Sequence, residues 1–207
     1  MSDPTLDDEE INRLHREKME RRQAARRKVL ATKTEERGLL VVHTGAGKGK
    51  TTAAFGMVLR CIGHGMRVGI VQFVKGAWGT GERTVLARFP DLVTCRAMGE
   101  GFTWDTKDRA RDIAAACAAW DLAKAMITDP TYRLVLLDEL NIVLRYGYLP
   151  VGDVVAALRA KPRDLHVVVT GRNAPPELIE AADLVTEMTL VKHPFRAGVK
   201  AQPGIEF

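Results

Sequence analysis

The sequence lacks features that would have placed the protein outside an ordinary cytoplasmic setting. No apolar run approaches membrane-spanning length, and the acidic N-terminal residues do not resemble a secretory signal, so we expect no membrane partner. The three cysteines, Cys61, Cys95 and Cys117, form no Cys-x-x-Cys pair and stand among apolar or helical neighbours. We therefore expect buried, reduced thiols and a cytoplasmic protein.

Composition and charge narrow the class of protein only slightly. The 207 residues are enough for one α/β domain with an appendage and a substantial core. A hydrophobic content of 46% and a charged content of 28% are typical of globular proteins. The net charge of +5 is compatible with binding to nucleic acid, but it is equally compatible with binding to an anionic small molecule.

A charged arm, residues 1–37, precedes the main domain, residues 38–207. The arm is acidic near its start and basic towards its end, which is the order that a helix dipole favours. Its apolar stripe is sparse, so we expect a largely solvated helix. Three interpretations stay open: a frayed tail, a basic arm for nucleic acid, and a helix that orders against a ligand or partner subunit.

Apolar strands alternate with helices beyond Arg37. This pattern predicts a mostly parallel central sheet with helices on both faces, an α/β fold like that of P-loop NTPases, in which ligands bind at the carboxyl ends of the strands. The expected strands are 39–43, 67–73, 92–97, 132–137, 165–170 and 184–190; the expected helices are 51–63, 108–128 and 151–161, with a loop over 75–82.

The strongest motif is a glycine-rich turn between the first strand and the first helix of this domain. Its residues are Gly45, Ala46, Gly47, Lys48, Gly49, Lys50, Thr51 and Thr52. Backbone N–H groups, a helix N-terminus and Lys50 attract phosphate, and the Thr51 hydroxyl suits Mg²⁺. The usual spacing requires a glycine where Thr44 stands, so the loop is one residue short. This shortening points away from an ordinary ATPase.

Two further motifs carry chemistry. An apolar strand ends in Asp138-Glu139, which places carboxylates beside the phosphate loop, where Mg²⁺ bridges protein and phosphate oxygens. Phe102 and Trp104 lie in a glycine-flanked stretch and either offer a rigid apolar surface or anchor the loop onto the domain. The basic C-terminal residues, including His193, are expected to form an irregular loop.

Together these motifs resemble the corrinoid adenosyltransferases of the ATP:cob(I)alamin type. The resemblance covers residues 38–207, and its motifs keep the family's order and spacing. They are Gly45–Gly56, Val71–Gly76, Gly101–Trp104, Leu137–Leu140, Thr170–Arg172 and Val191–Gln202.

The resemblance implies a reaction in which a corrinoid reduced to cobalt(I) attacks the 5′ carbon of ATP and inorganic triphosphate leaves. Because the reactive atom lies at the opposite end of ATP from the terminal phosphorus, ATP would lie reversed in the cradle. No general base is required, since cobalt(I) carries no proton.

The resemblance also implies residue roles. Lys50, Thr51, Phe102 and Trp104 would be catalytic, with the two aromatics displacing the lower axial ligand of the corrinoid. ATP would be held by Gly45, Ala46, Gly47, Lys48, Gly49, Lys50, Thr51, Thr52 and Arg172, and Mg²⁺ by Thr51 and Glu139 with Asp138 in support. Lys192 and Lys200 would contact phosphate or corrinoid side chains. Ala46 departs from the asparagine common in the family, which removes one side-chain contact to the nucleotide.

The resemblance further implies a homodimer and a reduced flavoprotein as electron donor, with no nucleic acid partner. Two alternatives stay open. A P-loop ATPase or kinase acting at the terminal phosphate would form ADP or orthophosphate. A non-catalytic ATP- or nucleic-acid-binding module would show salt-dependent oligonucleotide binding without turnover.

Overall fold

The chain forms two units, residues 1–36 and 37–207, in the computed structural model, which describes residues 7–74, 81–98 and 108–206. The N-terminal unit contains helix α1 (Asp8–Ala31). Its N-cap, Asp7, accepts a hydrogen bond from the backbone N–H of Glu10 at 2.8 Å. Acidic residues fill its first turn, and Lys28 lies in its last turn, as the helix dipole favours. No residue of α1 is buried, in keeping with its sparse apolar stripe.

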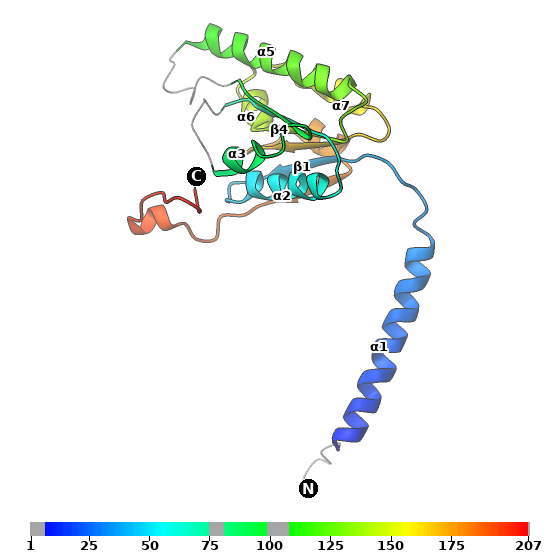
Figure 1. Ribbon diagram of the computed structural model, residues 1–207. Coiled ribbons are helices and arrows are strands. Elements are labelled where there is room, and N and C mark those ends of the chain that lie inside the picture. Colours follow the sequence, from blue (N-terminus) through cyan, green and yellow to red (C-terminus); the bar gives the residue numbers. More distant parts are fainter. Residues whose placement is uncertain (1–6, 75–80, 99–107, 207) are drawn as a thin grey trace. The chain divides into compact units, whose positions relative to one another are not determined.

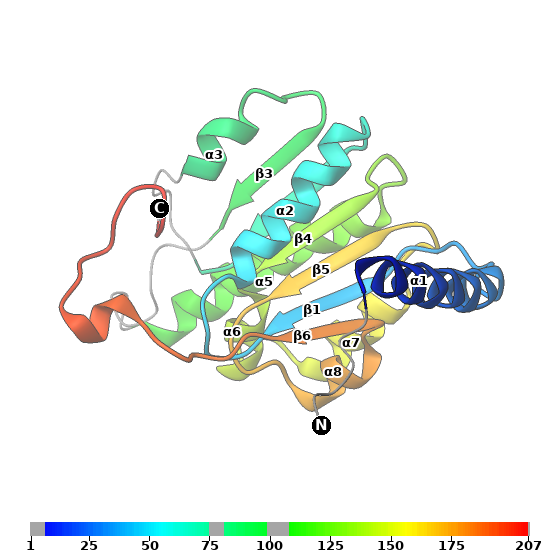
Figure 2. The same cartoon turned by 90° about the horizontal axis from the view of Figure 1, so that it is seen from below.

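Six strands of the described residues form one sheet in the second unit, in the order β3-β2-β4-β5-β1-β6 (Figure 2). Every neighbouring pair is parallel. The strands are β1 (Leu40–Thr44), β2 (Val68–Gln72), β3 (Val93–Ala97), β4 (Leu134–Asp138), β5 (His166–Thr170) and β6 (Leu184–Glu187). β5 therefore lies between β4 and β1, so the ends of these three strands are adjacent.

Helices cover both faces of the sheet, as the sequence predicts (Figure 1). Along β4, Val135 and Leu137 pack into one core cluster, whereas Leu134 and Leu136 pack into the other. Alternation of this kind buries both faces of a parallel strand. One cluster is covered by α2 (Lys50–Gly63) and α3 (Gly81–Leu86). The other is covered by α5 (Arg109–Thr128), α6 (Leu140–Arg145), α7 (Val151–Arg159) and α8 (Pro176–Ala181).

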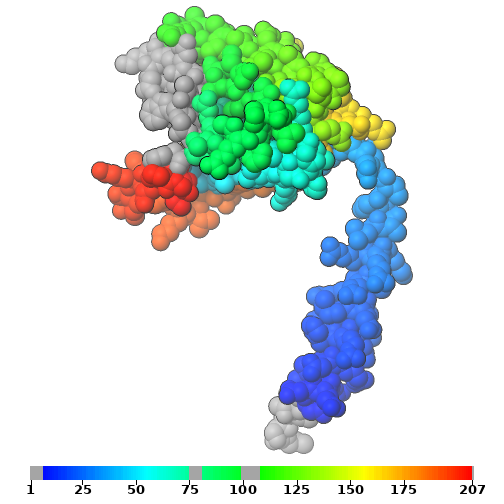
Figure 3. Space-filling view, in the orientation of Figure 1, coloured from blue at the N-terminus to red at the C-terminus, as the bar shows by residue number. Residues whose placement is uncertain are grey.

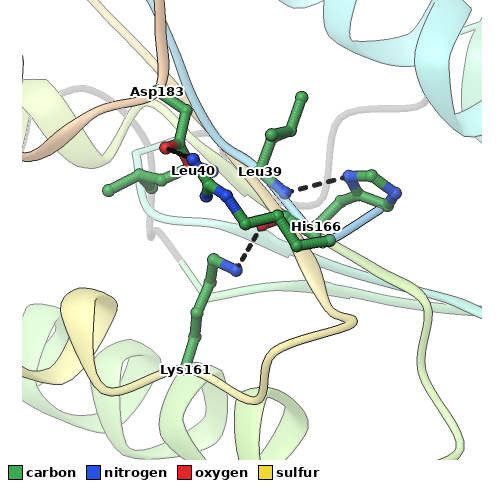
Figure 4. A network of polar contacts seen from close by, with 7 residues as sticks. Leu39, Leu40, Lys161, His166 and Asp183 are labelled. Carbon is green, nitrogen blue, oxygen red and sulfur yellow. Dashed lines mark hydrogen bonds and ion pairs between the residues drawn. The ribbon is translucent and has the colours of Figure 1, made fainter. Parts of the chain in front are cut away.

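A network of polar contacts connects the amino ends of β1 and β5 (Figure 4). The motifs lie at the opposite, carboxyl ends of the strands. The backbone N–H of Leu39 donates to Nδ1 of His166 at 3.1 Å. Asp183 accepts from Arg37 at 2.6 Å and from the backbone N–H of Leu40 at 2.8 Å. The hydrogen bond from Arg37 lowers the pKa of Asp183. Lys161 Nζ donates to the carbonyl of Gly38 at 2.7 Å, so this network fixes the chain where it enters the sheet.

The structure corrects several sequence-based expectations. The last strand ends at Glu187 rather than at residue 190, because the next residue pairs with the turn that leaves β1: the carbonyl of Met188 accepts from the N–H of Gly47 at 2.6 Å. Cys117 is exposed rather than buried, while Cys61 and Cys95 are half-buried. Helices α3, α6 and α8 were not expected, and α3 takes in the end of the expected loop over 75–82.

The C-terminal segment, residues 191–206, is mostly irregular, with a short 3₁₀ helix, η1 (Pro194–Ala197). His193 caps η1 by accepting from the N–H of Phe195 at 3.1 Å. Figure 3 shows this segment at the surface in red, and Val191, Phe195 and Ile205 are more than three-quarters exposed. In the part of the chain that the structure describes, no helix has the length and apolar character needed to cross a membrane.

Candidate functional site

The phosphate loop connects β1 to α2 and depends on glycine for its shape. Gly45 and Gly49 have φ values of 97° and 102°, a region that side chains rarely adopt. A Cβ atom on Gly45 would lie 2.4 Å from the carbonyl oxygen of Met188, and one on Gly47 would lie 2.5 Å from that of Thr189. The loop is therefore packed against the chain that follows β6, and its glycines allow the close approach.

The start of α2 presents positive charge to this loop. Gly49 is the N-cap and offers no side-chain acceptor, so the first N–H groups of α2 remain suited to an anion. Lys50 Nζ folds back over the loop, donating to the carbonyl of Gly45 at 2.9 Å and to that of Gly47. Burial, followed by the positive charge of Arg172, lowers the pKa of Lys50, while Glu139 opposes the shift. A bound polyphosphate would offset this crowding of cations.

Buried polar side chains end the neighbouring strands. Asp138, at the end of β4, is fully buried. Its Oδ1 accepts from the hydroxyls of Thr51 at 2.9 Å and Thr170 at 2.7 Å. Its Oδ2 accepts from the side-chain amide of Gln72 at 3.0 Å. The strands β2, β4 and β5 and the helix α2 therefore meet at one carboxylate.

Glu139 adopts an unusual backbone conformation next to Asp138. Its φ is 65°, in the left-handed region that few residues other than glycine occupy, and it is the N-cap of α6. Its backbone N–H donates to the hydroxyl of Thr170 at 2.9 Å. Strained backbone positions of this kind persist only where the surrounding structure holds them in place, and they cluster at functional sites.

The oxygen donors at this edge fit Mg²⁺. The Thr51 hydroxyl and the Asp138 carboxylate lie where the phosphate loop ends and α2 begins, and Glu139 follows Asp138 in the chain. Mg²⁺ in nucleotide sites takes one or two carboxylates together with substrate phosphates, rather than a cage made by the protein alone. Within residues 7–74, 81–98 and 108–206, no group of three or more His, Cys, Asp or Glu residues is placed to hold a metal ion.

Most residues named from the sequence are brought together by the fold. Gly45 to Gly49 connect β1 to α2, and Lys50 to Thr52 begin α2. Asp138 ends β4 and Glu139 follows it, while Arg172 follows β5 and lowers the pKa of Lys50 by its positive charge. Ala46 is exposed. Phe102 and Trp104 lie outside the described residues. Lys192 and Lys200 lie in the C-terminal segment, and both are exposed.

Three contributors to the site were not assigned from the sequence. Gln72 and Thr170 each end an apolar strand, and a buried polar residue at that place was the signal that could have identified them. Glu206 forms an ion pair with Lys48 of the phosphate loop. The sequence gives no sign of that pair, since 158 positions separate its members.

Several known proteins are similar to this chain in sequence. Residues 36–207 match the family described as ATP:corrinoid adenosyltransferase BtuR/CobO/CobP. A corrinoid adenosyltransferase of Pseudomonas aeruginosa is 57% identical over 198 residues, which cover 96% of this chain and 98% of the relative. Another, from Sinorhizobium sp., is 57% identical over 195 residues, which cover 93% of this chain and 91% of the relative.

Likeness to solved structures is weaker. The RadB recombinase covers 75% of this chain and 77% of its own, with 16% identity and a TM-score of 0.44. Because that likeness is so low, the assignment of the chain to a family depends on the sequence matches.

Proposed function

Because this chain belongs to the ATP:corrinoid adenosyltransferase family, we propose that its phosphate loop and the adjoining strand ends form the site where the 5′-deoxyadenosyl group of ATP moves to cobalt. The protein is an enzyme of this class, and its substrates are ATP and a corrinoid. In the reaction, the cobalt(I) electron pair forms the new bond to C5′. The bond between C5′ and the triphosphate oxygen breaks, and triphosphate leaves with the electron pair of that broken bond.

The phosphate loop holds the leaving group rather than a reacting phosphorus. Lys48, Lys50 and Arg172, together with the first N–H groups of α2, supply positive charge where charge grows on the triphosphate. ATP therefore lies reversed relative to ordinary P-loop enzymes, with its C5′ directed away from the loop. The loop that is one residue short suits such a change of register.

Thr51 and Glu139 would hold Mg²⁺ beside the loop. When bound, it neutralises charge on the triphosphate and so favours its departure. Asp138 supports it by accepting the hydrogen bond from the Thr51 hydroxyl at 2.9 Å. The meeting of this hydroxyl and carboxylate at a glycine-shaped phosphate loop, in a chain of this family, is the observation that carries the assignment.

The remaining roles complete the proposal. Phe102 and Trp104 displace the lower axial ligand of the corrinoid, which eases reduction of cobalt. A reduced flavoprotein supplies the electron. The enzyme acts in the cytoplasm as a homodimer. These roles are derived from the family resemblance.

An anaerobic assay tests the proposed reaction. The protein is mixed with chemically reduced cobalamin, ATP and Mg²⁺, the visible spectrum is followed, and the phosphate product is identified. We expect a light-sensitive adenosylated corrinoid together with triphosphate. The Lys50→Ala variant should lose at least about 100-fold in rate, since it removes a charge-stabilising donor at the leaving group. Steady formation of ADP with an unchanged corrinoid spectrum would instead support a P-loop ATPase.

A further inference from the structure

Thr170 lies among the carboxyl ends of the strands, where the proposed site is found. It ends β5, the strand between β4 with its carboxylates and β1 with the phosphate loop. Its side chain is fully buried. The hydroxyl donates to Asp138 Oδ1 at 2.7 Å and accepts from the backbone N–H of Glu139 at 2.9 Å. One hydroxyl thus contacts both neighbouring acidic residues.

The direction of these hydrogen bonds follows from chemistry. An ionised carboxylate only accepts, so the single hydroxyl proton of Thr170 and that of Thr51 both point to Asp138. The oxygen lone pairs of Thr51 are then directed away from Asp138 and remain suited to a cation. Gln72 holds the second oxygen of Asp138 at 3.0 Å, which prevents the carboxylate from turning away.

The same hydroxyl also fixes the start of the next residue. Glu139 leaves the strand with φ at 65°, and its N–H is anchored on Thr170. In this position Glu139 acts electrostatically on Lys50 of the phosphate loop.

We infer that Thr170 is a positioning residue for the two acidic residues: it holds Asp138 on the Thr51 hydroxyl, and it fixes the backbone that carries Glu139 at the Mg²⁺–ATP site. The inference rests on the proposed function, because it assigns roles within the same Mg²⁺–ATP site. In this role Thr170 acts through Asp138 and Glu139. Outer partners of metal ligands usually change metal affinity by about 10- to 100-fold when removed, which sets the expected size of the effect.

The test compares ATP binding by calorimetry in MgCl₂ and in EDTA for the full chain. In Thr170→Val, which keeps the shape but removes the hydroxyl, the tightening of ATP binding by Mg²⁺ should fall about 10- to 100-fold. Binding in EDTA should change less than about threefold, since the loop and its cations are untouched. Thr170→Ser restores the hydroxyl and should restore the tightening. Thr131→Val is the matched control, because it removes an exposed threonine hydroxyl before the amino end of β4. Its tightening of ATP binding by Mg²⁺ should equal that of the wild type.

Several results would overturn the inference. Equal tightening by Mg²⁺ in the wild type and in Thr170→Val would do so, as would an equal loss of ATP binding with and without Mg²⁺, which indicates general damage to the site. If Thr170→Val does not fold, Gln72→Met gives the same test from the other oxygen of Asp138, with a smaller loss of tightening expected because Glu139 keeps its anchor.

Failure of the inference is distinguishable from failure of the proposed function. Wild-type ATP affinity that ignores Mg²⁺, or a wild type that transfers no adenosyl group, contradicts the proposed function itself. A wild type that transfers the group, with a Thr170→Val variant that keeps the full effect of Mg²⁺ on ATP binding, contradicts only the role of Thr170.

Discussion

Replacing Gly45 with alanine should damage the phosphate loop more than the same change at a comparable glycine in open space. Gly45 has φ 97°, and an added Cβ would lie 2.4 Å from the carbonyl oxygen of Met188. Gly65, which follows α2, has φ 68°, but an added Cβ there would meet nothing within 4 Å. Both variants force a side chain into the left-handed region, whereas only Gly45→Ala also collides with backbone.

The expected magnitudes follow from these contacts. The left-handed conformation costs about 1–2 kcal/mol in either variant. The collision at Gly45 also disturbs two backbone hydrogen bonds, from Gly47 N–H to Met188 at 2.6 Å and from Met188 N–H to Thr44 at 2.9 Å. At about 0.5–1.5 kcal/mol each, their loss adds about 1–3 kcal/mol to the destabilisation by Gly45→Ala. For a domain of this size, the added loss corresponds to about 2–12 °C in Tm.

Thermal unfolding and ATP titration of both variants measure the difference. Gly45→Ala should unfold at a lower temperature than Gly65→Ala and should also bind ATP more weakly, while Gly65→Ala should bind ATP as the wild type does. Gly47→Ala adds a useful case, because its Cβ would lie 2.5 Å from the carbonyl oxygen of Thr189 without a positive φ. Equal Tm values and equal ATP affinities for Gly45→Ala and Gly65→Ala would refute the packing of the loop against the chain after β6.

Two further predictions concern ion pairs of the second unit. Glu206→Gln frees Lys48 for phosphate, so ATP should bind up to about fivefold more tightly at low salt, with the gain fading as salt screens the pair; weaker binding in a titration would show that the carboxylate assists the nucleotide. Asp183 has a pKa lowered by its hydrogen bond from Arg37, so its carboxylate stabilises the fold above its unfolded pKa of about 3.9, and this stabilisation is lost as pH falls through the lower folded value. The Tm difference between wild type and Asp183→Asn should therefore be largest near neutral pH and shrink below about pH 4; a difference that stays constant with pH contradicts this role.

The sequence predicts the elements with strong apolar patterns and the loop between them. The parallel sheet, α2, α5 and α7 all follow from such patterns, and the expected strands agree with the observed ones to within a few residues. The short helices α3, α6 and α8 have six residues each, too few for a periodic pattern to stand out from a loop. Cys117 illustrates a second limit: the alanine-rich α5 buries Ala116, Ala119 and Ala123, but its uniform composition does not reveal which face turns inward.

The site shows the same division. Motif spacing predicts that the phosphate loop and the Asp138-Glu139 pair lie close together, because both follow the carboxyl ends of parallel strands. It does not reveal which side chains contact Asp138 and Glu139, since those contacts depend on the strand order. Only when β5 lies between β4 and β1 does Thr170 stand within reach of both acidic residues. Nor does it reveal the pairing of Lys48 with Glu206, which depends on the course of an irregular C-terminal segment.

The engagement of the carboxylates bears on which reaction the site favours. Hydrolysis of ATP at the terminal phosphate needs a group that orients or activates water. Asp138 is fully buried and accepts from Thr51, Thr170 and Gln72, so its lone pairs are directed to protein donors rather than to a water molecule. Glu139 lies in the field of Lys50. Carboxylates that hold a hydroxyl in place and balance nearby cations are suited to a site that binds a departing triphosphate. A nucleophile that carries no proton, such as cobalt(I), does not need these carboxylates to act as a base.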